Sequence, residues 1–332
     1  MRHRFILFAI LAASGVNAGE SRISDRGEVR FVPSKDEGLV AERFRLAEHA
    51  FTWQAPRLPT VTASFEVWDV TFPSPIRTPQ ESNNTVWCEY YQPNRAGKKP
   101  GVIVLHILGG DFELSRLFCN CLAQNGICAL FVKMPYYGER RDPASPRRMV
   151  SVDPAETVAG MTQAVLDIRR ATAWLAARPE VDANALGIFG ISLGGITSSL
   201  AATAEPRLQN VCMLLAGGDV GRVAWESLEL RGMREKLLAK GVNREQFLET
   251  LRTIDPVTYA AAAQGKRILM LNARNDEVIP RECTLSLWRS LGEPEIHWYS
   301  GGHYSAIWHL PSALARVARF FATAGSGAGA SP

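Results

Sequence analysis

The sequence predicts an α/β fold, in which a mostly parallel central sheet carries helices on both faces. Two observations lead to it: short apolar runs follow one another after Pro100, and helical segments lie between them. Such runs are typical of strands buried on both faces of a parallel sheet, and their alternation with helices is the pattern of βαβ units. The five runs are Val102–Leu105, Cys128–Val132, Leu186–Phe189, Val211–Leu215 and Ile268–Leu271.

The first residues resemble an export signal. Arg2 and Arg4 precede the apolar run Phe5–Val16, which ends in a small-x-small site at 16–18. The run is too short to span a bilayer comfortably, and Gly19 rather than a cysteine follows it, so we expect no stable membrane anchor. We therefore expect residues 1–18 to be a signal peptide, and the mature protein to be periplasmic or secreted.

The charge balance argues against a nucleic acid partner. Removing residues 1–18 takes away two arginines and no acidic residue, which lowers the formal net charge from +4 to +2. Basic runs interleaved with aromatic residues, which typify nucleic acid binding, are missing from the sequence. Composition does not indicate an oligomeric state.

Six cysteines follow the signal segment, and an exported protein could oxidise some of them. Cys119 and Cys121 fall on an expected helix, where a step of two residues points them to different faces, so they should not pair with each other. Without a second Cys/His pair their spacing is weak evidence for zinc. We expect buried thiols with at most one disulfide.

The segment before the parallel sheet is expected to have two parts. Residues 19–64 are mixed and charged and are predicted to form an extension packed outside the domain, with a helix over Lys35–Ala50. Phe65–Thr71 and Thr85–Gln92 are rich in aromatic residues and valine and predict antiparallel lead-in strands. The catalytic domain is then expected to cover residues 65–323.

Helical patterns complete the domain. Asp153-Pro154 starts a long helix that ends before Pro179 and should cover the sheet. Leu228–Lys240 and Arg244–Thr253 predict two charged amphipathic helices within an insertion at 221–256, either a small cap over the ligand site or a surface hairpin. The Gly-, Ala- and Ser-rich tail at 324–332 is expected to be disordered.

Ser192 is the candidate nucleophile, because it lies in Gly-Ile-Ser-Leu-Gly-Gly between an apolar run and a helix-forming stretch. A strand, a sharp turn and a helix of this kind lift a serine hydroxyl clear of a parallel sheet. Gly190 and Gly194 are expected where strand and helix leave no room for side chains. A serine in an ordinary glycine-rich turn is the alternative.

The serine needs a base and an acid that orients it, in the chain order serine, acid, histidine. Asp276 follows the last of the five apolar runs, and His303 follows a further strand in Ser-Gly-Gly-His. Glu277 and Asp219 are competing acids, but Glu277 is expected to point elsewhere from the same turn. Asp276 and His303 are thus the predicted acid and base.

Acyl transfer also requires donors for the developing oxyanion. The backbone N–H of Leu193 follows the nucleophile and supplies one donor. The second is expected from the loop after Leu105, where Leu108 is the candidate and Ile107 the alternative. His106 is expected to be a structural hydrogen-bonding residue.

Together these residues resemble the α/β-hydrolase superfamily, over roughly residues 65–323. The sequences around His106 and Ser192 are similar to those of dienelactone hydrolases, although serine replaces the cysteine of that family and Ile107 replaces its glutamate. The long gap between Ser192 and Asp276 is more similar to acetyl-xylan esterases. The resemblance implies the α/β-hydrolase fold with the triad and oxyanion roles given above.

We therefore expect an exported serine hydrolase that acts on short-chain acyl or acetylated carbohydrate esters. Tyr136 and Tyr137 follow a strand at the same sheet edge and are candidates for binding substrate, or else belong to an ordinary loop. No metal or nucleotide cofactor is implied, because the corresponding motifs are missing. The alternatives are a peptidase resembling prolyl oligopeptidase and a non-catalytic binding protein with the same fold.

Overall fold

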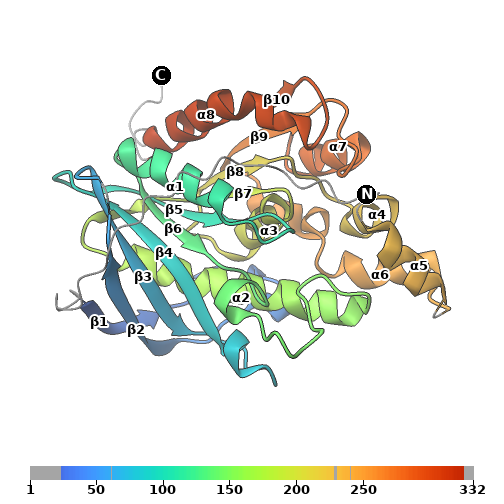
Figure 1. The fold of residues 1–332 in the computed structure, drawn as a ribbon, viewed down its shortest axis with the longest axis horizontal. Coiled ribbons are helices and arrows are strands. Elements are labelled where there is room, and N and C mark those ends of the chain that lie inside the picture. Colours follow the sequence, from blue (N-terminus) through green and yellow to red (C-terminus); the bar gives the residue numbers. More distant parts are fainter. Residues whose placement is uncertain (1–23, 61, 228–229, 240, 325–332) are drawn as a thin grey trace.

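A single sheet of ten strands forms the centre of the computed structural model, which describes residues 24–60, 62–227, 230–239 and 241–324 (Figure 1). The strand order is β1-β2-β3-β4-β6-β5-β7-β8-β9-β10. The neighbours from β1 to β6 in this order pair antiparallel, and those from β6 to β10 pair parallel. The strands are β1 (Ser24–Phe31), β2 (His49–Leu58), β3 (Phe65–Pro73), β4 (Thr85–Pro93), β5 (Lys99–Leu105), β6 (Cys128–Val132), β7 (Val181–Ile191), β8 (Asn210–Leu214), β9 (Arg267–Ala273) and β10 (Glu295–Tyr299).

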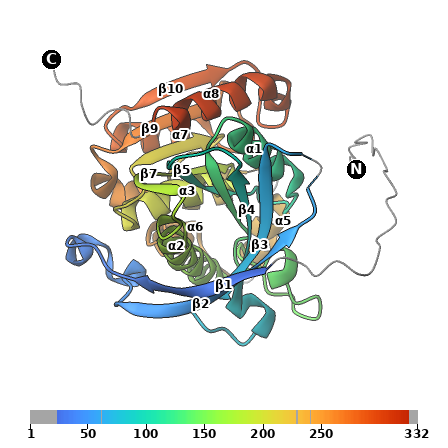
Figure 2. The same ribbon diagram turned by 90° about the vertical axis from the view of Figure 1, so that its left-hand side faces the viewer.

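Helices cover both faces of this sheet (Figures 1 and 2). The α-helices are α1 (Glu113–Gln124), α2 (Pro154–Ala176), α3 (Leu193–Ala204), α4 (Val220–Glu226), α5 (Arg231–Ala239), α6 (Arg244–Arg252), α7 (Arg281–Ser290) and α8 (Leu310–Ala322). Short 3-10 helices are η1 (Glu37–Leu39), η2 (Glu42–Phe44), η3 (Glu81–Asn84), η4 (Gly138–Arg140), η5 (Pro256–Ala263) and η6 (Ser305–His309). The predicted α/β fold and all five predicted apolar strands are confirmed.

The period of two along the strands divides the core into two layers. Val102 and Val104 of β5 share one buried cluster with side chains of α1 and α8. Ile103 and Leu105 belong to the other cluster, with side chains of α2, α3 and α7. Central strands are therefore apolar on both faces, which is why they appear in the sequence as uninterrupted apolar runs.

The N-terminal segment departs from the sequence prediction. The helix predicted over Lys35–Ala50 is wrong: the segment holds only the short helices η1 and η2 and the start of β2. Far from lying outside the domain, β1 and β2 extend the central sheet. The physical reason is an alternation along β2: Phe51, Trp53 and Ala55 are buried, whereas Thr52 and Gln54 between them are exposed.

The long helix α2 begins and ends as predicted. The Asp153 side chain accepts a hydrogen bond from the Ala155 N–H at 2.8 Å, and Pro154 occupies the first helical turn, where no N–H donor is needed. Within the described part of the chain, no helix is both long and apolar enough to cross a membrane. The predicted signal peptide and residues 325–332 of the predicted tail lie outside the described residues.

Arg169 of α2 ties the N-terminal segment to the domain. Its guanidinium donates to both carboxylate oxygens of Glu37, at 2.7 and 2.6 Å, and to the Phe44 carbonyl. Its Nε also donates to Glu205 at 3.4 Å. Burial alone would raise the pKa of Glu37, but the hydrogen bonds and charge of Arg169 help to hold this pKa below its usual value. The contact is a buried ion-pair network rather than a surface salt bridge.

Replacing Arg169 by methionine is expected to lower the free energy of unfolding by about 3 kcal/mol, because the carboxylates of Glu37 and Glu205 lose their shared partner. Chemical denaturation measures this change. Arg231→Met is the control, since Arg231 and Glu235 form an exposed pair and its loss should cost less than about 0.5 kcal/mol. Similar small losses in both variants would contradict the assigned role of Arg169.

Candidate active site

Ser192 stands at the sharp turn between β7 and α3. Its φ of 54° and ψ of −117° lie where residues with a side chain rarely occur. The Ser192 N–H donates to the Leu214 carbonyl of β8 at 2.8 Å, which fixes the turn to the sheet. The structure thus contains the strand, turn and helix that the sequence predicted around this serine.

Two glycines make this turn possible. A Cβ atom on Gly190 would lie 2.2 Å from the Gly194 carbonyl oxygen, and one on Gly194 would lie 2.6 Å from the His106 carbonyl oxygen. Both distances are far below van der Waals contact, and the obstructing atoms are backbone that cannot rotate away. Strand β7, helix α3 and the end of β5 therefore meet backbone to backbone around the serine.

The structure brings Ser192, His303 and Asp276 into one hydrogen-bonded chain. His303 Nε2 lies 3.1 Å from Ser192 Oγ, and His303 Nδ1 lies 2.9 Å from Asp276 Oδ2. The side chains are largely shielded from solvent: 9% of that of His303 and 2% of that of Asp276 are exposed. The three residues come from the ends of β7 and β9 and from the loop after β10.

Backbone groups hold the Asp276 carboxylate in place. Its Oδ1 accepts hydrogen bonds from the N–H groups of Val278 and Ile279, at 2.9 and 2.7 Å. The nearby Asn275 N–H donates to the Gly301 carbonyl at 3.0 Å and so joins the aspartate loop to the histidine loop. Both loops are thereby positioned as a unit.

The two competing acids have other contacts. Glu277 was expected to point away, and it makes no hydrogen bond to the imidazole, but its carboxylate accepts the backbone N–H of His303 at 2.8 Å. This anchoring role was missed, because nothing in the sequence distinguishes it from a solvated loop acid. Asp219 begins α4 in a left-handed conformation, and among the carboxylates of the described residues only that of Asp276 hydrogen-bonds the His303 imidazole.

The loop after β5 places Leu108 next to the serine turn. Leu108 and Leu193 line the same pocket as Ser192. Within the described part of the chain, neither of their backbone N–H groups has a hydrogen-bond acceptor, so both remain able to bind an incoming oxyanion. The alternative donor, Ile107, is not among the residues that line this pocket.

His106 braces that loop from inside. Its Nε2 accepts the Met134 N–H at 3.1 Å, so the proton lies on Nδ1, which donates to the Ile107 carbonyl at 2.8 Å. Burial lowers the pKa of His106 to about 4, which keeps the ring neutral near pH 7. These contacts agree with the predicted structural role.

Tyr136 and Tyr137, the predicted substrate contacts, are used inside the fold. Neither is among the described residues that line the pocket beside Ser192, and the substrate-binding role expected for them stays a prediction. Tyr136 is buried beneath the Arg147 guanidinium, which lies 4.6 Å from the ring centroid. The Tyr137 hydroxyl donates to the Leu108 carbonyl at 2.9 Å and so orients the Leu108 peptide. Tyr136 is buried and Tyr137 is partly buried, which removes apolar surface from water, and the residue types of the loop alone do not predict this.

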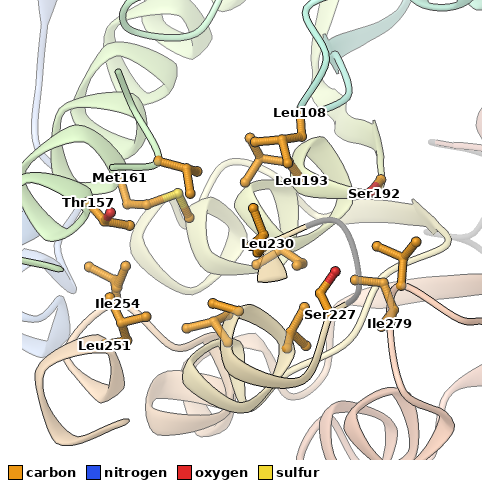
Figure 3. A pocket seen from close by; sticks show the side chains of 16 residues that line it. Leu108, Thr157, Met161, Ser192, Leu193, Ser227, Leu230, Leu251, Ile254 and Ile279 are labelled. Carbon is orange, nitrogen blue, oxygen red and sulfur yellow. The ribbon is translucent and has the colours of Figure 1, made fainter. Parts of the chain in front are cut away.

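An apolar pocket opens beside Ser192 (Figure 3). Helices α2, α3, α4 and α6 and the loop before α7 contribute to it, so the predicted insertion at 221–256 reaches the site. This insertion contains α4, a helix that the sequence did not indicate, besides the two predicted ones. The lining residues are Leu108, Val150, Thr157, Met161, Ser192, Leu193, Ile196, Val220, Val223, Ala224, Ser227, Leu230, Leu251, Ile254, Val278 and Ile279.

All six cysteines are free in the structure, and five of them are buried. Burial raises the pKa of these thiols, for example that of Cys128 to about 11, so they stay protonated and unreactive near neutral pH. The structure agrees with the predicted buried thiols.

Comparisons with known families match two overlapping parts of the chain. Residues 60–222 match the family described as alpha/beta hydrolase domain containing 18, and residues 161–306 match the prolyl oligopeptidase family. Curated relatives from two strains of Mycobacterium tuberculosis, both described as uncharacterized, are 34% identical over 155 residues, or 46% of this chain. The match spans only 35% of the length of these relatives.

Solved structures share the fold at low sequence identity. Acetyl xylan esterase 1 from Thermoanaerobacterium sp. is 19% identical, with a TM-score of 0.61 over 79% of this chain and 87% of that one. An acetyl xylan esterase from Paenibacillus sp. is 20% identical, with a TM-score of 0.61 over 80% and 88%. A cold-adapted esterase from an Arctic intertidal metagenomic library is 16% identical, with a TM-score of 0.54 over 80% and 97%.

The buried neutral state of His106 predicts a loss of stability in acid. Because its pKa is about 4 in the folded chain and about 6.5 when unfolded, the unfolded state binds more protons between these values. The free energy of unfolding should therefore fall by up to about 3 kcal/mol as the pH drops from 6.5 to 4.

Denaturation at a series of pH values tests this expectation. His106→Asn keeps a donor toward the Ile107 carbonyl but cannot titrate. It should be less stable at pH 7, because the Met134 N–H loses its acceptor, yet show a shallower pH dependence. Equal slopes in the two proteins would rule out His106 as the source.

Proposed function

Since the chain has the α/β-hydrolase fold, we propose that it is an exported serine hydrolase that cleaves carboxylic esters. The observation that carries the proposal is the unbroken hydrogen-bonded chain from Ser192 Oγ through His303 to Asp276. In this proposal Ser192 is the nucleophile, His303 the general base and Asp276 the group that orients the base.

In the first half of the reaction, Ser192 Oγ attacks the acyl carbon while its proton passes to His303 Nε2. The Asp276 carboxylate holds the Nδ1 proton and stabilises the imidazolium that forms. Backbone N–H groups of Leu193 and Leu108 receive the negative charge on the carbonyl oxygen. The bond between acyl carbon and alcohol oxygen then breaks, and the alcohol leaves with the proton from His303.

Water completes the reaction on the acyl-enzyme. His303 removes a proton from the water molecule as its oxygen attacks the acyl carbon, and the same two N–H groups again stabilise the oxyanion. Release of the carboxylic acid returns the proton to Ser192 Oγ. No other group is required for this cycle.

The proposed substrate class is that of small esters, and it includes acetylated carbohydrates. The similar folds of acetyl xylan esterases and other esterases support this choice, although identities of 16–20% speak for the fold alone. Export is proposed from the basic and apolar residues at the start of the sequence.

Peptide hydrolysis is the second candidate. It is favoured by the match of residues 161–306, which include Ser192, Asp276 and His303, to the prolyl oligopeptidase family. Both reactions use the same three groups, so the substrate pocket decides between them. The largely apolar pocket beside Ser192 favours the ester.

Hydrolysis of aryl esters and aryl amides by the purified protein tests the proposal. Ester turnover should fall at least about a thousandfold in Ser192→Ala and to a similar degree in Asp276→Asn, which loses the correct tautomer of His303. Ser290→Ala is the matched control, because this hydroxyl bonds only within α7, and it should retain activity within about twofold.

Three results would count against the proposal. Turnover that survives in Ser192→Ala would remove the serine from the chemistry. Amide turnover that exceeds ester turnover would favour the peptidase. A protein that binds such compounds without cleaving them would favour the non-catalytic alternative.

A further inference from the structure

The pocket beside Ser192 lies where an acyl group would lie. Ser192, Leu193 and Leu108 line it, whereas His303 is not among its described lining residues. In an ester poised for attack, the acyl carbon is at Ser192 Oγ and the alcohol oxygen is within reach of His303 Nε2. A pocket that includes the proposed oxyanion donors and omits the histidine therefore suits the acyl side of the bond.

The lining of the pocket is almost entirely aliphatic. Thirteen of its sixteen described residues have apolar side chains, and none is charged. Figure 3 shows Thr157, Leu251 and Ile254 at the end remote from Ser192, so the space continues well beyond the serine. An acetyl group would leave this apolar surface uncovered, and a charged acyl group would lose its water without gaining a partner.

Ser227 is the exception in this lining. It is 2% exposed, and its Oγ has no hydrogen-bond partner among the described residues. The other hydroxyl groups of the pocket are engaged: Thr157 bonds with Ser151, and Ser192 with His303. In Figure 3 the Ser227 oxygen points into the space between Leu230 and Ile279.

An unpaired buried hydroxyl is unfavourable, and a ligand oxygen that bonds it would remove the penalty. A site built to hydrogen-bond a substrate oxygen discriminates strongly against the analogue that lacks it. Ser227 lies at the C-terminal end of α4, in the insertion rather than in the core of the fold. A specificity-determining residue in an insertion can vary without disturbing the reacting groups.

We infer, on the premise of the proposed function, that the preferred substrate is an ester of a medium-length apolar acyl chain that carries one hydroxyl or keto oxygen. The chain fills the aliphatic pocket, and the Ser227 hydroxyl bonds the oxygen. Ser227 is thus a specificity-determining residue.

A series of aryl esters tests the chain length. The value of kcat/KM should rise at least about tenfold from acetate to hexanoate, because each methylene group buried in an apolar pocket contributes to binding. A value that falls steadily beyond acetate would overturn the inference while leaving the proposed ester hydrolysis intact.

Hexanoate esters with a hydroxyl group at successive carbons test Ser227. With the natural protein, kcat/KM for one of these isomers should exceed that for the plain hexanoate about fivefold, and Ser227→Ala should bring this ratio to about one. Thr157→Val is the matched control: its hydroxyl lies in the same pocket but already bonds Ser151, so both esters should change by the same factor. The same uniform change in Ser227→Ala would overturn the role of Ser227.

Binding to Ser192→Ala separates this inference from the proposed function. Calorimetry should show that hexanamide binds at least about tenfold more tightly than acetamide, whether or not the natural protein turns over any ester. If the natural protein turns over no ester but Ser192→Ala shows this binding preference, the proposed reaction is wrong and the inferred acyl pocket stands. Equal affinities for the two amides would defeat the apolar acyl pocket.

Discussion

The backbone contact of β7 with α3 is the constraint on which the site depends. The backbone of Gly190 approaches that of Gly194, and Gly194 approaches the end of β5, more closely than any side chain would allow. This contact holds Ser192 at a φ of 54°. Unfavourable backbone geometry of this kind persists only where the surroundings are well packed. The surrounding strands supply that packing, because their residues are buried on both faces. A tightly packed core is thus what lets one hydroxyl project from the edge of the sheet toward the imidazole.

Aromatic side chains around His106 also support the site. The His106 ring packs against Phe112 and Tyr137, with centroids 5.0 and 4.5 Å away, and its two nitrogens bond the backbone on either side. Tyr137 in turn bonds the Leu108 carbonyl. The loop that carries Leu108, the proposed oxyanion donor, is therefore held by the side chains of His106 and Tyr137. A donor fixed in this way needs little reorganisation during the proposed reaction.

The parts of this structure that follow local rules could be predicted from the sequence. The parallel strands, helix α2 and the serine turn each have a periodicity, a cap or a pair of glycines that acts over a few residues. The order of Ser192, Asp276 and His303 also follows from strands that end at one edge. The sequence predictions fail where contacts between distant segments determine the local structure. Lys35–Ala50 has a helix-like composition, yet Arg169 and the edge of the sheet hold it in other conformations. Packing of distant segments also determines the burial of Tyr136, the contact of Glu277 with His303 and the place of Ser227 beside the pocket, and no local pattern records it.

The ion pair between Glu37 and Arg169 has a consequence for the folding of the chain. The partners are 132 positions apart, and β1 and β2 pair with each other and with β3 rather than with any parallel strand. A contact that closes so large a loop forms slowly, because the chain loses conformational entropy before the native contacts compensate for the loss. We therefore expect the segment that holds Glu37 to be fixed to the domain late in folding. Before that contact forms, β1 at the edge of the sheet is not held by it, and an unprotected β-edge is the kind of surface through which incompletely folded chains associate.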